Sequence, residues 1–344
     1  MSITINEYKE KLESIKGMTI AIVYVFEGDT TAGYAHYDAW KADVISSWLL
    51  ACQELSCLPL VMGLRTFIHK AMGNTLPRIN FVINLNNGTY SLSTLGLLPS
   101  VCSYLGLPCI PCDAFQTIAG EEKRVANLIA NKCGIQLPRE LNPSTPGGIY
   151  RPLGLGSSRG VTRNNKNVDC VRGLYQEFIP GFDMTTPIMY NPLTGNLETL
   201  SPVLYLPDSK NTSWFLGETE KDNHSGYTKT VVNLSEEAKE HYLLMCKWYG
   251  IRTFCRIDAR VYCEDYNDLS NTIDAPIPMN RIRFLEINPM PTVKEGINFH
   301  TALKLTDKNQ PLGQCIDMYF TETSNATYTG FILSSAMLSL RAKY

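Results

Sequence analysis

The sequence predicts an α/β protein whose parallel, helix-covered sheet is followed by a smaller α+β part and a third, mixed part. Strand-like apolar runs alternate with helical patterns over residues 18–110, which is typical of a parallel sheet with crossover helices. A loop rich in glycine and serine then follows a strand, and polar residues alternate along two later strand-like runs. The length of 344 residues predicts two or three domains.

The elements of the first part are predicted from β-branched runs and helical spacing. Residues 18–25 read MTIAIVYV, an uninterrupted apolar run typical of a buried parallel strand. Trp40, Val44 and Trp48 recur at helical spacing and predict a helix over 37–55. The same signals predict strands at 58–62, 78–85 and 108–110 and a helix over 95–105.

The chain changes character after this sheet. Charges on one face predict a helix over 121–132. The turn residues Pro180 and Gly181 predict a pair of strands on either side, 169–179 and 182–190. Further predicted elements are strands at 147–152, 197–206, 252–261 and 280–287, a helix capped by Ser235 and ended by Gly250, and helices near 294–305 and 333–342.

Composition argues against partners that need a strongly charged or apolar surface. The formal net charge is −2, so no overall field attracts nucleic acid or an anionic membrane. The polar start lacks a secretory signal, and no run of about 18 apolar residues predicts a membrane span. We therefore expect a cytoplasmic protein with reduced cysteines. Cys109 and Cys112 form a CxxC, but the prolines around them make a redox or metal site the less favoured interpretation.

The loop after Arg151 is a candidate phosphate site. Its sequence, RPLGLGSSRG, places a cation at the end of a strand and small residues behind it. Glycines let the backbone approach a ligand closely, and successive N–H groups can bind phosphate oxygens. Arg159 adds a second guanidinium. The alternative is a glycine-rich hairpin without a ligand, since the loop matches neither the Walker nor the dinucleotide motif.

Two short motifs on strand-like runs form a candidate magnesium site. These are Arg256-Ile-Asp258 and Glu286-Ile-Asn288. Alternate side chains of a strand face the same way, so each motif places two polar groups on one face. Carboxylate and amide oxygens are hard ligands that suit Mg²⁺. If the two strands pair, the four groups converge; an exposed sheet face with ordinary ion pairs is the alternative.

In this order, the motifs resemble those of the D-alanine–D-alanine ligase branch of the ATP-grasp superfamily, over residues 80–300. The loop after Arg151 resembles the family's KP…GSS-x-G loop, and QEFIPGFD at 176–183 resembles its E-x-[FWY]-[IL]-x-G-x-E hinge. The RID and EIN motifs resemble R-[VI]-D and E-[IVA]-N, and Glu122-Lys123 resembles [MD]-D-K. The resemblance implies an ATP-grasp fold. The domains that the resemblance implies are an N-terminal α/β substrate-side domain at 1–112, a central subdomain at 113–180 and a C-terminal catalytic domain at 181–344. The last two would clamp ATP.

The resemblance also implies roles for individual residues. Lys123 and Arg151 would hold the ATP phosphates, and Ser157 and Ser158 lie in the loop that closes over them. Asp183 would hold the ribose hydroxyls. Gln176, Phe178 and Ile179 would line the adenine pocket, with hinge backbone groups reading the base, and Glu177 and Leu285 are further candidate nucleotide-binding residues. Asp258, Glu286 and Asn288 would hold two Mg²⁺ ions, and Arg256, Ser157 and Lys221 would act in catalysis, with Lys229 as an alternative to Lys221.

Such a protein would be an ATP- and Mg²⁺-dependent carboxylate–amine ligase that works through an acyl phosphate. The chain departs from the family pattern where the family binds two D-alanines, at 26–32 (FEGDTTA), 86–91 (NNGTYS) and 289–298. This argues against D-alanyl-D-alanine synthesis and for other amino acids or amino acid-like substrates in a specialised biosynthetic pathway. The candidate substrate contacts are Glu27, Asn86, Lys294, Glu295 and Asn298. The nucleotide site differs less: Arg replaces Lys at 151, Gln replaces an acid at 176 and Asp shortens the acid at 183.

Other functions remain open at this point. A kinase or a cyclising ligase could use the same scaffold, and a non-catalytic ATP-binding module is a different class. A dinucleotide-binding oxidoreductase is disfavoured because no GxGxxG follows the first strand. The resemblance also implies a homodimer.

Overall fold

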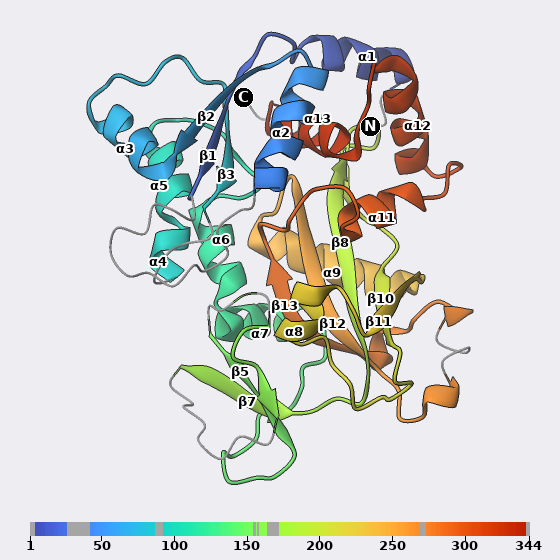
Figure 1. The fold of residues 1–344 in the computed structure, drawn as a ribbon. Helices are drawn as coiled ribbons and strands as arrows, with labels where there is room; N and C mark the ends of the chain where they lie inside the picture. The colour runs from blue at the N-terminus through green and yellow to red at the C-terminus, as the bar shows by residue number, and fades with distance from the viewer. Residues whose placement is uncertain are drawn as a thin grey trace.

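A computed structural model describes residues 4–25, 42–86, 92–153, 156, 158–163, 172–268 and 273–341. Their strands form three sheets (Figure 1). Among the described residues, no helix combines the length and the apolar character needed to cross a membrane.

The N-terminal sheet has four parallel strands in the order β2-β1-β3-β4. They are β1 (Thr19–Tyr24), β2 (Leu58–Gly63), β3 (Phe81–Leu85) and β4 (Cys109–Ile110). The central strand β3 is buried throughout, as its continuous apolar run requires. Helices α2 (Ala42–Glu54), α3 (Leu64–Met72), α4 (Leu92–Leu95) and α5 (Leu97–Tyr104) connect the strands. The predicted parallel α/β layer is therefore confirmed.

The two ends of the described chain meet on this sheet. Helices α1 (Ile5–Glu13), α11 (Asn298–Lys304), α12 (Pro311–Glu322) and α13 (Tyr328–Arg341) share one core with α2. Figure 1 shows α13 against α2 at the top of the molecule. Trp48 of α2 stacks at 6.3 Å on Phe254, which begins the strand that carries the candidate metal site. The C-terminal helices thus fix the N-terminal sheet against that strand.

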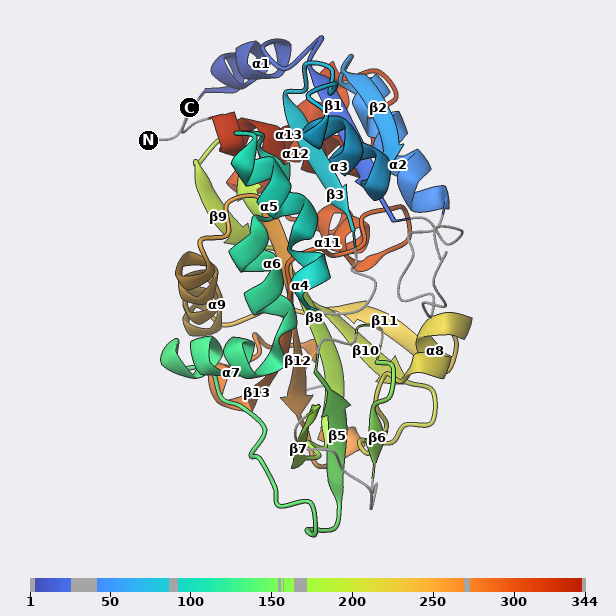
Figure 2. The ribbon, with the colours of Figure 1, turned by 90° about the vertical axis from the view of Figure 1, so that its left-hand side faces the viewer.

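The largest sheet has six strands and is antiparallel, in the order β11-β10-β8-β12-β13, with β9 on β8. The strands are β8 (Gly181–Asn191), β9 (Asn196–Thr199), β10 (Val203–Pro207), β11 (Tyr227–Val231), β12 (Phe254–Tyr262) and β13 (Ile282–Asn288). Helices α6 (Ala114–Glu121), α7 (Lys123–Lys132) and α9 (Glu236–Tyr249) cover one face and form a second core (Figure 2). Short helical turns α8 (Glu218–Asn223), η1 (Tyr266–Asp268) and η2 (Met279–Arg281) lie in the connections.

A third sheet is small and lies at one end of the molecule (Figure 2). Its order is β6-β5-β7, with β5 (Gly148–Pro152), β6 (Thr162–Arg163) and β7 (Gly173–Glu177) antiparallel. The predicted pairing of 169–179 with 182–190 is wrong. The chain leaves this sheet after β7 and enters the six-stranded sheet at Gly181, whose φ is +129°. A side chain at Gly181 would meet the carbonyl oxygen of Val261 at 1.9 Å, so the crossing requires glycine.

Two further differences from the predicted elements have local causes. The single strand expected at 197–206 is divided into β9 and β10, because Pro202 cannot donate to a ladder. Strand β13 carries an irregularity against β12: Asp258 is opposite Glu286, but Ala259 is opposite Phe284. Leu285 is therefore an extra residue, a β-bulge.

Candidate active site

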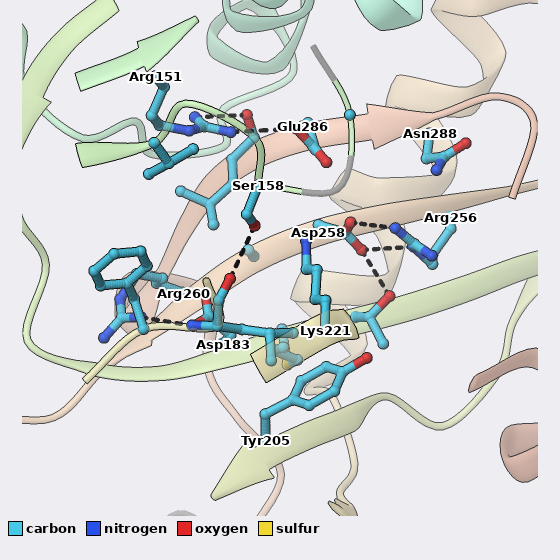
Figure 3. Close-up of a pocket in the computed structure, with 18 of the residues that line it drawn as sticks. Arg151, Ser158, Asp183, Tyr205, Lys221, Arg256, Asp258, Arg260, Glu286 and Asn288 are labelled. Atoms are coloured by element: carbon cyan, nitrogen blue, oxygen red, sulfur yellow. Dashed lines mark hydrogen bonds and ion pairs between the residues drawn. The ribbon is translucent and has the colours of Figure 1, made fainter. Parts of the chain in front are cut away.

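A cavity of about 580 Å³ lies between the small sheet and the six-stranded sheet (Figure 3). Most of the candidate residues line it: Lys123, Arg151, Ser158, Gln176, Glu177, Phe178, Ile179, Asp183, Lys221, Arg256, Asp258, Leu285, Glu286, Asn288, Lys294 and Asn298. Asn86 is buried outside the cavity lining, where its side-chain amide donates to the Thr94 carbonyl, and Glu295 is exposed. Ser157 and Glu27 fall outside the described residues.

Glu286 lies among cations from four separate elements, α7, β5, α8 and β12. Its Oε2 is 3.6 Å from Lys123 Nζ and 3.4 Å from an Arg151 guanidinium nitrogen. Arg151 also donates to the carbonyl of the bulge residue Leu285 at 3.0 Å. Burial alone raises the pKa of Glu286, but Lys123, Arg151, Lys221 and Arg256 outweigh it and lower that pKa to about 2. The carboxylate is therefore ionised at neutral pH.

Lys123 reaches this point because of the helix that it begins. Glu122 caps α7, and its carboxylate accepts from the Arg124 and Val125 amides. Lys123 follows as the first helical residue and is only 4% exposed. Burial lowers the pKa of its ammonium, while Glu286 acts in the opposite direction. A buried lysine beside a buried arginine is costly, so the two cations are placed for an anion.

Arg256 and Asp258 lie on one face of β12 and form a bidentate pair. Nε of Arg256 is 2.8 Å from Oδ1 of Asp258, and a terminal nitrogen is 2.7 Å from Oδ2. Thr185 of the neighbouring strand β8 donates to the same Oδ1 at 2.6 Å. Figure 3 shows the pair between Arg256 and the Asp258 carboxylate. Burial lowers the pKa of Arg256 but the Asp258 carboxylate raises it further, so the guanidinium is charged.

The ladder between β12 and β13 determines which groups face each other. Asp258 is opposite Glu286, and Arg256 is opposite Asn288. Asn288 Oδ1 accepts from the Met290 amide at 2.9 Å. No group of three or more His, Cys, Asp or Glu side chains suited to a metal occurs in the described ranges. A cation here would therefore be held by two carboxylates and one amide oxygen, with further ligands from outside the protein.

The other end of the cavity has an aromatic and polar wall. Gln176 is 1% exposed, and its amide nitrogen is 3.3 Å from the Pro138 carbonyl oxygen. Its Oε1 is buried without a hydrogen-bond partner in the part of the chain that is described. Two guanidinium groups lie near the Phe178 ring, with Arg163 3.8 Å and Arg260 4.8 Å from the ring centroid. An unsatisfied buried acceptor of this kind calls for a donor from a ligand or a water.

A covering segment at 212–218 is tied to both sheets. Ser158 donates to the Leu216 carbonyl at 2.8 Å, and Arg159 is 3.6 Å from Glu218. The Leu216 amide donates to Asp183 at 2.8 Å, and Asp183 also pairs with Arg260 at 2.9 Å. The glycine and serine loop thus contacts the segment at 212–218 that lines the cavity.

Arg260 is a site residue that the sequence reasoning missed. The signal was present, since Arg256, Asp258 and Arg260 follow one another at the period of a strand. The motif ends at Asp258, whereas the polar face of β12 continues to Arg260.

A second polar group of residues lies at the far end of the cavity from Gln176. The Asn298 amide nitrogen is 2.5 Å from the Tyr205 hydroxyl, and Lys229 Nζ is 5.8 Å from the Tyr205 ring centroid. Lys294 Nζ pairs with Asp43 at 2.5 Å. Burial and the nearby Arg256 lower the pKa of Lys229. The lining of the cavity also includes the apolar side chains Val44, Leu95 and Met290.

The CxxC lies apart from this cavity. The ten cysteines among the described residues are free thiols. The hydrogen bond to Cys102 and burial raise the pKa of Cys109, and burial raises that of Cys112. Thiols with raised pKa values are poor nucleophiles and poor metal ligands at neutral pH.

Comparison with known proteins was made for sequence and for fold. No family model matches the chain. D-alanine–D-alanine ligases of two Wolbachia pipientis strains are each 24% identical to it, over 172 and 173 residues. These matches cover 46% of this chain and 51% of each relative, so the chain spans about half the length of the curated relatives it matches.

Solved structures match over most of the chain. D-alanyl-alanine synthetase A of Vibrio cholerae has a TM-score of 0.62 at 14% identity, covering 95% of this chain and 99% of its own. The D-alanine–D-alanine ligase of Bacillus anthracis, in complex with ATP, has a TM-score of 0.59 at 14% identity, covering 95% and 98%. VanG D-Ala:D-Ser ligase of Enterococcus faecalis has a TM-score of 0.57 at 15% identity, covering 88% and 100%. The fold predicted from the sequence is thereby confirmed: this chain has the ATP-grasp fold of the D-alanine–D-alanine ligases.

Proposed function

We propose that the protein is an ATP- and Mg²⁺-dependent ligase that joins a carboxylate to an amine through an acyl phosphate. One observation supports this most directly. Asp258 and Glu286 are opposite each other on neighbouring strands, in a cavity that also holds Lys123, Arg151 and Arg256. Paired carboxylates beside several cations suit a polyphosphate with its metal, and a simple binding groove has no need of both.

The residues present fit ATP. Gln176 offers its unsatisfied Oε1 to the 6-amino group of adenine, and Phe178 and Leu285 offer apolar surface to the ring. Lys123 and Arg151 would hold phosphate oxygens, which would compensate their burial. Glu177 and Ile179 would present backbone groups to the base, and Asp183 would accept from the ribose.

The residues also fit magnesium. Asp258, Glu286 and Asn288 offer hard oxygen donors, and Mg²⁺ commonly uses one or two carboxylates together with phosphates and water. When bound, the metal would neutralise charge on the transferring phosphoryl group. We propose two ions, as the resemblance implies.

The chemistry then follows from the side chains around this point. A substrate carboxylate oxygen bonds to the γ-phosphorus, and the bond from that phosphorus to ADP breaks. The nitrogen of an unprotonated amine bonds to the acyl carbon, the bond from that carbon to the phosphate oxygen breaks, and the nitrogen loses one proton to the departing phosphate. Arg256 would stabilise the negative charge that develops on the acyl oxygens, and Lys221 or Lys229 the phosphoryl oxygens. The contact between Ser158 and Leu216 would keep water from the acyl phosphate.

The substrates are proposed to be amino acids or amino acid-like molecules other than two D-alanines, in a specialised pathway. Lys294 and Asn298 line the far end of the cavity and are the proposed contacts there. We propose residues 1–112 as the substrate-side domain, and 113–180 and 181–344 as the subdomains that clamp ATP. A cytoplasmic location and a homodimer remain part of this proposal.

The test is ADP and phosphate release with ATP and Mg²⁺ across pooled L- and D-amino acids, with products identified by mass spectrometry. A product lighter than its two substrates by one water is expected. The matched control is Asp258→Asn, which should abolish the product. A phosphorylated product without condensation would indicate a kinase. ATP binding without ADP release in any pool would indicate a binding module and overturn the proposal.

A further inference from the structure

Arg260 occupies the nucleotide end of the cavity and is directly opposite Asp183. The register of β12 against β8 pairs the two residues, so their contact is set by the sheet. Arg260 is only 4% exposed yet belongs to the cavity wall. The family motifs in the sequence give it no role.

The guanidinium of Arg260 joins three segments. Nε donates to the Ile179 carbonyl at 2.7 Å, and one terminal nitrogen donates to the Gly181 carbonyl at 2.7 Å. The same nitrogen donates to the Trp214 carbonyl at 3.0 Å. The other terminal nitrogen donates to Oδ2 of Asp183 at 2.9 Å. The hinge, the proposed ribose acid and the covering segment are therefore held by one planar group.

This arrangement fixes the Asp183 carboxylate. Oδ2 accepts two hydrogen bonds, from Arg260 and from the Leu216 amide at 2.8 Å. Oδ1 has no hydrogen-bond partner among the described residues, although Asp183 lines the cavity. The two oxygens of this carboxylate are therefore not equivalent, and one of them is left for a ligand.

We propose that Arg260 is a positioning residue for the nucleotide, holding Asp183 so that Oδ1 accepts a hydrogen bond from a ribose hydroxyl. The inference rests on the proposed function, because it assumes that ATP occupies this end of the cavity. It adds a consequence that the motifs do not contain: discrimination between ribonucleotides and deoxyribonucleotides depends on Arg260 as well as on Asp183.

Arg163 provides a matched comparison within the same cluster. Its guanidinium also lies on the Phe178 ring, at 3.8 Å, and it donates to the Ser213 carbonyl at 2.9 Å. Within the described part of the chain, Arg163 makes no hydrogen bond or ion pair with Asp183, in contrast to Arg260. Substitution of Arg163 therefore disturbs the ring contact and the covering segment without removing the Asp183 partner.

The experiment measures dissociation constants for ATP, 2′-deoxy-ATP and 3′-deoxy-ATP with Mg²⁺ by calorimetry. Wild type should bind at least one deoxy analogue about tenfold more weakly than ATP, as expected for a lost hydrogen bond to a charged group. Arg260→Met should bind ATP more weakly and lose this discrimination, to within about twofold. Arg163→Met should keep the wild-type ratio. If Arg260→Met does not fold, the ratio of the dissociation constants for the deoxy analogue and ATP is measured for two other variants. These are Asp183→Asn, which preserves shape, and Arg260→Lys, which preserves charge.

The outcomes separate this inference from the proposed function. No ATP binding by wild type would overturn the proposed function itself. ATP binding with no discrimination in wild type would show that Asp183 does not read the ribose. Weaker ATP binding by Arg260→Met with an unchanged ratio would make Arg260 a structural residue only. Either of the last two results overturns the positioning role while the ligase proposal stands.

Discussion

Two regions of the cavity, the β12–β13 end and the Asn298 end, differ in the partners of their polar side chains. At the β12–β13 end, carboxylates and cations from separate elements compensate one another, and the pKa of Glu286 falls to about 2. At the Asn298 end, polar side chains already have neutral or surface partners, such as Tyr205 for Asn298 and Asp43 for Lys294. The first end is built on paired strands, whereas Lys294 and Asn298 come from a loop and a helix start. Substrate preference can therefore change without moving the groups proposed to act on phosphate.

The largest effect is expected from Glu286→Gln. The variant keeps the shape of the side chain but removes the charge that Lys123 and Arg151 surround. Turnover should fall by about a hundredfold or more, because electrostatic groups aimed at a transition state have effects of this size. Steady-state kinetics with the identified substrates provides the measurement, and circular dichroism checks the fold. Near-normal turnover would remove the metal role and with it the contrast between the two ends.

The acid dependence of stability sharpens the same contrast. A carboxyl group with a depressed folded-state pKa stabilises the fold above its ordinary value near 4.5, and this stabilisation is lost as pH falls toward 2. For Glu286 the shift corresponds to on the order of 3 kcal/mol. Urea unfolding of wild type and Glu286→Gln should therefore give free energies that differ at neutral pH and approach each other as the pH falls from about 4.5 to about 2. A difference that stays constant on acidification would contradict the assignment of the shift to Glu286.

A moderate effect is expected at the other end, from Asn298→Ala. It removes the contact with the Tyr205 hydroxyl and an amide that lines the cavity. The KM for the amino acid substrate should rise about tenfold while the KM for ATP stays within about twofold, as expected for loss of a buried hydrogen-bonding group. Equal changes in both KM values would mean that the ends are coupled through the fold. Tyr205→Phe, which removes only the hydroxyl, is the matched variant.

The smallest effect is expected from Lys294→Met. Lys294 pairs with Asp43, whose side chain is 55% exposed, and exposed pairs contribute little. The free energy of unfolding should change by less than about 1 kcal/mol. A tenfold rise in the KM for one substrate would instead identify Lys294 as a direct substrate contact. The Asn298 end would then bind its substrate through a charged group.

The part of the candidate site that could be predicted is the part that follows from the two-residue period of a strand. The pairs Arg256 with Asp258 and Glu286 with Asn288 were predicted to share faces, and the ladder does bring the two motifs opposite each other. Arg260 was missed because no motif extends to it, although the same period does. The neighbour of Asp183 depends on which strands pair, and periodicity does not contain that information.

The fold was predictable at the level of layers and less so at the connections. The parallel N-terminal sheet followed from apolar runs that only a doubly covered sheet can bury. Pro180 and Gly181 predict a hairpin at the point where the chain crosses between two sheets. The reason is that Pro-Gly favours a turn whether the flanking strands pair or separate. Long-range contacts decide between these two outcomes, and they are absent from a local pattern.

The bulge at Leu285 has a consequence for how the chain tolerates insertion and deletion. Successive residues of a regular strand face opposite sides, yet Leu285 and Glu286 both line the cavity. One extra residue thus lets an apolar side chain proposed to contact a base and a carboxylate proposed to hold a cation be neighbours in the sequence. Removing a residue between Ile282 and Leu285 would restore regular alternation and turn one of these two side chains away. The number of residues in this strand, which sets its register against β12, is therefore under tighter constraint than the identity of its apolar side chains.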